Sequence, residues 1–441
     1  MLIYSLSITH RLKYISDFIG KELCGRPFQL TDNRVEYENW PDLKINYTPE
    51  PIAGDQCWIK PHPILFENGI HEQEIDCFES NRVTAFFKSE GDFPFDIFAA
   101  AFYLLSRYEE YLPHQKDMYG RYAHGNSLAF RQQFLDTPLV NSWLTEFGKK
   151  LQEKFPAFLL HHSPFTFIPT YDIDEAYSFK HKDWWRSAGA AVKDILRGKW
   201  KRFSLRRAVL NNQTPDPFDS YDWIDNLHRP YKCKPRYFFL VPEKAGKYDR
   251  NNLPSEMAMQ VLIRQHADKY SIGVHPSWQS GDDTALMRKE IRTIEHITKL
   301  KVMASRQHFI RLSLPETYRR LVEAGIKEDF SMGYGSINGF RASVASPFYW
   351  YDLEKDEATC LLLYPFCYME ANSFYEQQLT PEQAFKEMQH YYEEIKKVNG
   401  TLITIWHNTF LGTDEKFKGW REVYSKFFHQ AMDESKTIKS A

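Results

Sequence analysis

The chain has 441 residues, 43% of them hydrophobic, and a formal net charge of -2 at pH 7. A chain of this length favours two domains over a single small core, and its balanced charge gives no reason to expect nucleic acid as a partner. No stretch reaches about 18 consecutive apolar residues, so the sequence predicts no transmembrane helix.

The N-terminus and the cysteines bear on the cellular compartment. Met1-Leu2-Ile3-Tyr4-Ser5 lacks the basic and apolar regions of a signal peptide. The six cysteines are scattered, without C-x-x-C or zinc-finger spacing. Scattered thiols in a chain without a leader are typical of a reducing compartment, so we expect a cytoplasmic protein. The sequence does not fix the oligomeric state.

Residues 1–160 are predicted to form a smaller α+β domain. Short alternating segments broken by Pro, Gly and Asn indicate a mixed β unit over the first 90 residues or so. Asp96 can cap a helix whose apolar residues from Ile97 onward fall on one face, and a second helix is predicted over residues 139–155. Pro156 and the segment His161-His162-Ser163-Pro164 mark a boundary near residue 160. No role follows from these patterns.

Residues 161–441 alternate between strand and helix patterns. We expect seven strands, over residues 165–171, 236–241, 271–274, 302–308, 328–332, 360–368 and 402–406. Helices are expected over residues 253–270, 283–300, 314–324 and 381–398. Seven such units indicate an α/β fold, a (β/α) barrel that is seven-stranded and incomplete. A doubly wound parallel sheet is the alternative, because periodicity does not decide whether a sheet closes.

A basic insertion near residues 180–210 interrupts this pattern after the first strand. Between Lys180 and Arg207 there are ten Lys or Arg residues against two Asp, interleaved with Trp184, Trp185, Trp200 and Phe203. The segment is interpreted as a solvated helical insertion. The alternative is a weak contact with an anionic surface through residues 180–207, since basic-aromatic helices can lie on such surfaces.

Two carboxylates close the first predicted strand, in Pro169-Thr170-Tyr171-Asp172-Ile173-Asp174. The carboxyl ends of strands are where β/α proteins carry their chemistry. Asp172 and Asp174 point the same way if the strand stays extended, because side chains alternate with period two. A cation on one of them would leave the other free as a general base. A helix cap or a loop salt bridge is the structural alternative.

Three histidines end later strands in the same manner: His275, His308 and His407. Each alone could be a satisfied structural histidine, but their shared edge with the carboxylate pair predicts a metal site. Arg341 lies in the loop Gly339-Phe340-Arg341-Ala342, where it could pair with the free carboxylate. The aromatic run over residues 347–352 could wall a sugar site or pack beneath a loop.

Taken in order, these segments resemble the polysaccharide deacetylases, the NodB-type group of carbohydrate esterases. The family's acidic strand end is similar to Thr170-Tyr171-Asp172-Ile173-Asp174, and its H-S-x-x-H motif to His275-Pro276-Ser277. Its arginine-bearing loop is similar to Phe340-Arg341-Ala342, and its late strand end to Ile405-Trp406-His407. The resemblance covers residues 165–415. The segment over residues 104–111 resembles an uncharacterised domain that precedes such deacetylases in Bacteroidetes-type proteins.

The resemblance implies a role for each of these residues. Asp172 would be the general base, oriented by Arg341, and His407 the general acid. Asp174 and His275 would hold a divalent metal, with zinc as the default for such ligands.

The second histidine of the family motif is missing, because position 279 is Gln. His308 is expected to supply the third ligand instead.

The resemblance thus implies a metal-dependent hydrolase that removes N-acetyl groups from an amino sugar or a polysaccharide precursor. Two alternatives stay open. The chain could be a metal amidohydrolase for a small amide that is not a sugar. It could also be a non-catalytic carbohydrate-binding protein with a degenerate site.

Overall fold

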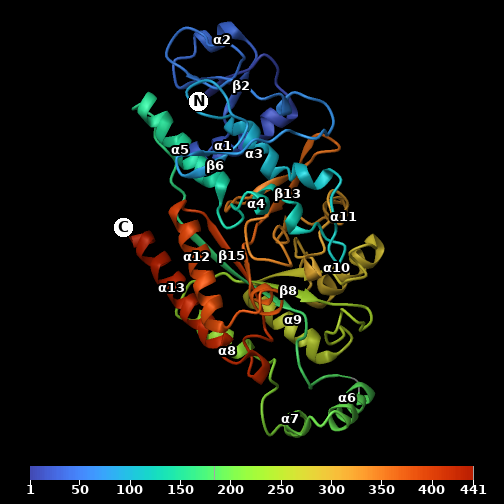
Figure 1. Cartoon of the computed structure of the whole chain (residues 1–441). Helices are drawn as coiled ribbons and strands as arrows, with labels where there is room; N and C mark the ends of the chain where they lie inside the picture. The colour runs from blue at the N-terminus through green and yellow to red at the C-terminus, as the bar shows by residue number, and fades with distance from the viewer. Residues whose placement is uncertain (183, 441) are drawn as a thin grey trace.

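Two parallel-stranded sheets organise the chain, one in each half (Figure 1). The computed structural model describes residues 1–182 and 184–440, and for residues 184–186 and 434–440 it describes the backbone alone. The first sheet has four strands and the second has nine. A separate two-stranded hairpin belongs to the N-terminal half.

The N-terminal unit is a small α+β structure. Its sheet has the order β2-β1-β3-β4, and its strands are β1 (Leu2–Tyr4), β2 (Gln29–Thr31), β3 (Lys44–Asn46) and β4 (Cys57–Trp58), with the hairpin β5 (Phe78–Ser80) and β6 (Val83–Ala85). Its helices are α1 (His10–Cys24), α2 (Arg34–Glu38), α3 (Ile97–Leu105), α4 (Leu128–Arg131) and α5 (Leu139–Lys154). Asp96 caps α3 by accepting a hydrogen bond from the amide of Ala99, as predicted, and every residue of α3 is buried.

The C-terminal sheet has the order β12-β13-β11-β10-β9-β8-β7-β15-β14. Its strands are β7 (Thr166–Ile173), β8 (Arg236–Leu240), β9 (Ser271–His275), β10 (Ala304–Ser305), β11 (Glu328–Asp329), β12 (Phe348–Asp352), β13 (Glu357–Leu363), β14 (Tyr368–Met369) and β15 (Thr401–His407). All neighbours are parallel except the pair β12 and β13. In the described part of the chain, β12 and β14 remain the two edges, so the barrel is open, as predicted.

Helices lie between many of the successive strands of this sheet, with one more after the last strand, and they cover it (Figure 1). They are α8 (Tyr221–His228), α9 (Met257–Lys269), α10 (Thr284–Thr298), α11 (Glu316–Glu323), α12 (Pro381–Lys397) and α13 (Trp420–Ser440). This alternation gives the α/β fold class that the sequence predicts.

The strand count differs from the prediction at two places. The antiparallel strand β12 lies where no strand was predicted. The strand expected over residues 360–368 is two strands, β13 and β14, which lie toward opposite ends of the sheet. Pro365 lies between them, and a proline cannot donate a ladder hydrogen bond. The chain therefore leaves the sheet there and re-enters beside β15, which makes eight parallel strands in the described part of the chain.

The two units are packed together. The connection from α5 to β7 contains the division predicted near residue 160, and that division remains a prediction. One hydrophobic core cluster includes residues of both units, for example Phe102 and Trp350. A buried ion pair, Glu110 with Arg341, also joins them.

After β7 the chain forms α6 (Trp184–Leu196) and α7 (Trp200–Leu210), which protrude from the body at the end away from the N-terminal unit (Figure 1). They occupy the predicted basic insertion. The side chains of Trp184 and Trp185 lie outside the described residues. Among the described residues, no helix is long and apolar enough to span a membrane.

Candidate metal centre

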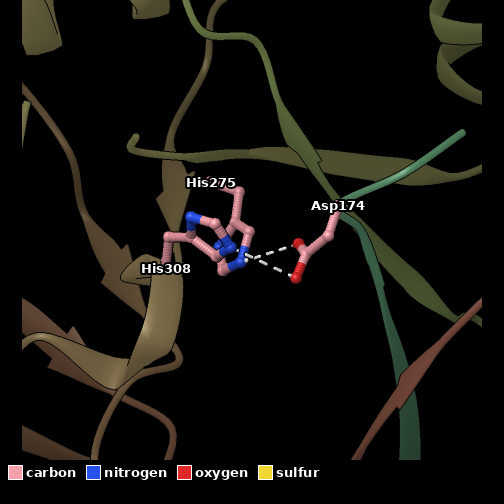
Figure 2. Close-up of side chains that lie close together, drawn as sticks. All are labelled: Asp174, His275 and His308. Atoms are coloured by element: carbon pink, nitrogen blue, oxygen red, sulfur yellow. Dashed lines mark ion pairs between the residues drawn. The ribbon is translucent and has the colours of Figure 1, made fainter. Parts of the chain in front are cut away.

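Asp174, His275 and His308 form a close cluster at the carboxyl edge of the large sheet (Figure 2). Asp174 directly follows β7, His275 ends β9, and His308 opens a 3-10 turn after β10. One ligand atom from each lies within 4.8 Å of the others. The Nε2 atom of His275 is 3.2 Å from Asp174 Oδ1, and that of His308 is 3.3 Å from Asp174 Oδ2. The structure thus brings together the three predicted ligands.

The register of the sheet explains why these residues meet. His407 pairs with Asp172 across β15 and β7, and Leu240 pairs with His275 across β8 and β9. Parallel strands end at one edge, so side chains at these positions converge there although they are far apart in the sequence.

Hydrogen bonds behind the two histidines orient their rings. The Nδ1 atom of His275 contacts the carbonyl oxygen of Arg306, and that of His308 lies 3.0 Å from Asp249 Oδ1. Both partners are acceptors, so each ring donates from Nδ1, and its Nε2 atom is left to bind a metal ion or, in its place, a proton. Both Nε2 atoms face Asp174.

This arrangement fits a metal ion. Two imidazole lone pairs facing a carboxylate repel it unless a cation lies between them. Asp174 Oδ1 is buried and has no hydrogen-bond partner among the described residues. Two histidines and one carboxylate, each histidine held from behind, are a donor set typical of catalytic divalent-metal sites. The cluster could therefore hold a divalent metal.

The charges around the cluster shift the pKa values of Asp174 and His308 in the directions that favour a cation between them. Burial alone would raise the pKa of Asp174, but His308, His275 and His407 hold it well below its usual range. Burial alone would lower the pKa of His308, but Asp174 and Asp249 raise it to about 9. Positive charge is therefore strongly favoured at this point of the structure.

Asp172 lies beside the cluster and is held by Arg306. The guanidinium of Arg306 donates to Asp172 Oδ1 at 2.7 Å, and Asp172 Oδ2 is 3.8 Å from His275 Nε2. Arg306 follows β10 directly, is fully buried and lies over the ring of Phe238. It fixes the Asp172 carboxylate next to the cluster without occupying its second oxygen.

The predicted pairing of Arg341 with Asp172 is wrong. Arg341 donates from two nitrogens to both oxygens of Glu110, and from a third to the carbonyl of Gly333. The loop that carries Arg341 lies against the N-terminal unit, where buried Glu110 offers a bidentate partner. Arg341 therefore joins the two units instead of serving the site.

His407 approaches Asp174 from β15. Its Nε2 atom is 3.3 Å from Asp174 Oδ2, and Glu370 Oε1 accepts from its Nδ1 atom at 2.7 Å and from its backbone amide at 2.6 Å. Burial alone would lower the pKa of His407, but Glu370 and Asp174 raise it well above its ordinary value. The ring is thus oriented by one carboxylate and directed at another.

A cavity of about 480 Å³ opens onto these groups. Its lining includes Asp172, Asp174, His275, His308 and His407, with aromatic side chains from Tyr119, Tyr248, Phe309, Tyr375 and Phe410. Tyr119 belongs to the N-terminal unit, which thus helps to form the cavity. The volume is in the range of small-molecule sites.

The aromatic run over residues 347–352 is not part of the cavity wall. It forms the antiparallel edge strand β12, and Trp350 and Tyr351 are buried in the core. The run therefore packs in the protein interior and does not form the wall of a sugar site.

Sequence reasoning missed three residues of the site: Asp249, Arg306 and Glu370. Arg306 lies within the predicted strand over residues 302–308, two residues before His308, so its position near the strand end was a usable signal. Asp249 lies in an irregular loop, and Glu370 follows β14, which was not predicted as a separate strand. The sequence therefore carries no signal for either residue. Gln279 is exposed and outside the cluster.

The N-terminal unit matches a family model of its own. Residues 1–156 match a family model described as a family of unknown function, DUF7033. That match ends before β7 and includes none of the cluster residues. No curated protein sequence matches the chain.

Among solved structures, the chain is similar to a putative polysaccharide deacetylase from Mycobacterium smegmatis, with 14% identity, a TM-score of 0.38, and 61% of this chain and 87% of that chain covered. A polysaccharide deacetylase from Bacillus cereus gives 10% identity, a TM-score of 0.30, and coverage of 60% and 88%. A CE4 family pseudoenzyme from Bacillus anthracis gives 10% identity, a TM-score of 0.31, and coverage of 61% and 63%. The predicted resemblance to polysaccharide deacetylases thus reappears as a distant likeness of fold.

Proposed function

We propose that the protein is a metal-dependent hydrolase that removes N-acetyl groups from an amino sugar or a polysaccharide precursor. The observation that carries the proposal is the convergence of Asp174, His275 and His308 beside a separately held carboxylate, Asp172. A divalent ion, zinc by its preference for this donor set, would polarise the amide carbonyl and make a nearby water molecule more acidic.

The protein's own residues supply the proton transfers. Asp172, fixed through Oδ1 by Arg306, takes a proton from the attacking water at Oδ2. The water oxygen bonds to the carbonyl carbon of the acetamide, and the C–N bond then breaks. His407, held through Nδ1 by Glu370, gives a proton from Nε2 to the departing amine. The products are acetate and a free amino sugar.

The cavity lining suits a saccharide. Aromatic rings offer flat faces to the apolar sides of sugar rings, and Tyr119, Tyr248 and Phe309 lie together on one side, with ring centroids 5.4 Å apart for Tyr119 and Phe309 and 5.5 Å for Tyr248 and Phe309. We also propose a cytoplasmic location. The substrate would then be among precursors made inside the cell.

The test combines metal analysis with acetate release. The purified full chain should carry a stoichiometric divalent metal and release acetate from saccharides that contain N-acetylglucosamine. Asp174→Ala and His308→Ala should each lose the metal and the activity. His407→Ala should keep the metal and lower kcat roughly 100-fold or more, because it removes an acid and no ligand.

Gln279→Ala is the matched control, since this residue occupies the family's usual ligand position but is exposed here. It should retain metal and activity. A chain without bound metal would contradict the proposal. A metal-loaded chain that cleaves simple amides but no acetamido sugar would favour the non-sugar amidohydrolase, and one that binds saccharides without releasing acetate would favour a degenerate binding protein.

A further inference from the structure

The protruding insertion exposes an unusual concentration of apolar side chains. Six of the eighteen large hydrophobic side chains that are exposed in the described part of the chain lie between Val192 and Leu210. On α6, Ala188, Val192, Ile195 and Leu196 follow the i, i+4, i+7, i+8 spacing of one helix face. Val192 is 55% exposed, Leu196 is 81% exposed, and Trp200 after the following turn is 61% exposed.

The opposite side of α6 is already used. Asp194 is buried there, with Arg206 of α7 at 2.8 Å and Arg202 at 3.8 Å. Arg202 and Arg206 also lie over the ring of Phe179, which precedes the insertion. The two helices are thus fixed to each other through a polar face, and the apolar face of α6 is directed outward.

Positive charge accompanies the exposed apolar face. Over residues 187–210 there are seven Lys or Arg residues against one Asp. Of these seven cations, Arg202 and Arg206 are the two that form ion pairs with residues that the structure describes. Lys193, Arg197, Lys199 and Lys201 are exposed on and beside the apolar face. The insertion therefore combines an outward apolar strip with unpaired cations.

We propose that α6 and α7 dock on the surface of an anionic lipid bilayer. Such a surface satisfies both features, because the apolar strip enters the interface while the cations meet lipid headgroups. A second copy of the chain is disfavoured, since it would bring another excess of positive charge against the first. A nucleic acid would pair with the cations but would leave the aliphatic strip exposed to water.

The insertion leaves the body from the same edge as the metal cluster. Asp174 and Glu175 line the cavity, and the chain continues from them into the insertion. Asp216 accepts hydrogen bonds from the amides of Ser178, Phe179 and Lys180, which anchors this exit. Docking would therefore bring the carboxyl edge of the sheet toward the bilayer.

Cosedimentation with vesicles tests the proposal on the full chain. The protein should bind phosphatidylglycerol vesicles and not phosphatidylcholine vesicles, and the binding should weaken with salt. Leu196→Ser with Trp200→Ser should lower the partition coefficient roughly tenfold. Lys193→Gln with Lys199→Gln and Lys201→Gln should lower it roughly 100-fold, at roughly fivefold per lysine.

Matched controls remove the same chemistry elsewhere. Leu159→Ser with Met118→Ser removes two residues that are 85% and 88% exposed outside the insertion, and it should leave the binding unchanged. Lys88→Gln with Lys299→Gln and Lys234→Gln, three exposed lysines outside the insertion, is the charge control and should leave the binding unchanged.

Acetate release from a soluble acetamido sugar should be the same in all these variants, so a failure of docking is distinguishable from a failure of the proposed function. The proposal is overturned if the wild-type chain ignores anionic vesicles, if the insertion variants bind as well as the controls, or if only a polyanion such as DNA shows the loss.

Discussion

Arg306 and Arg341 are both fully buried, yet they stabilise different parts of the molecule. Arg306 joins Asp172 to the carbonyl of Phe330, so it sets the position of a carboxylate at the cavity. Lysine in its place keeps a charge but cannot hold both partners. We predict that Arg306→Lys lowers kcat/KM roughly 10- to 100-fold while the metal content stays unchanged.

Arg341→Lys serves as the matched variant. It removes part of a bidentate contact with Glu110 and should reduce the free energy of unfolding by about 2 kcal/mol. Its kcat/KM per metal-loaded molecule should equal that of the wild type. Steady-state kinetics and urea denaturation of both variants would distinguish the two roles, and equal kinetic losses in both would contradict the assignment of Arg306.

Asp249 acts on the metal cluster through His308. Its carboxylate accepts from the ring and also from the amide of Trp278, so Asp249→Asn keeps the shape but removes the charge. Mutation of a residue that holds a metal ligand from behind typically lowers the metal affinity roughly 10- to 100-fold. For this conservative change we predict a roughly tenfold loss of metal affinity. Competition with a zinc chelator measures it. Asp268→Asn, an exposed carboxylate on α9, should show no loss.

At the scale of elements, His228 on α8 gives the strand β7 a dependence on pH. Tyr171 shares a hydrogen bond with its Nε2 atom at 2.7 Å, and Nδ1 is buried without a partner in the described residues. Burial lowers its pKa to about 4, although Asp225 opposes the shift. Between pH 6.5 and 4 the unfolded chain therefore binds a proton that the folded chain does not, so stability is lost as the pH falls through this window.

We predict that this histidine alone removes about 2 kcal/mol of stability between pH 7.5 and pH 5. His228→Gln keeps an acceptor for Tyr171 and does not titrate. The difference in unfolding free energy between wild type and variant, measured in urea at both pH values, isolates its contribution. A difference that does not change with pH would show that His228 is not held neutral.

The elements also show what the sequence could and could not predict. The strand ends that carry Asp174, His275, His308 and His407 were predictable. Short apolar runs indicate where each strand stops, and in a parallel sheet the carboxyl ends of the strands lie at one edge. The partner of Arg341 was not predictable, since Glu110 is 231 positions away in the sequence. Which carboxylate a buried arginine reaches depends on how the two units pack, and local pattern does not encode that.

At the scale of the whole molecule, the two units share their interior. The core cluster runs through both, and Tyr14 of α1 donates to the carbonyl of Tyr349 in β12. Arg121 of the N-terminal unit donates to the carbonyl of Phe309 beside the metal cluster. Separation of the units would therefore expose apolar surface and leave buried polar groups unpaired, Arg341 among them.

We therefore predict that the chain unfolds in one cooperative transition and that residues 161–441 do not fold alone. Removing one partner of a buried ion pair typically destabilises by roughly 3 kcal/mol or more, and the lost apolar contacts add to this. Near-UV circular dichroism and calorimetry of the full chain and of the fragment test the prediction. Cleavage of the intact protein near residue 160 is the matched control, because the two pieces should stay together and retain the metal. A soluble fragment with native near-UV signal and bound metal would show instead that the barrel is an independent domain and that the N-terminal unit only adds a wall to its cavity.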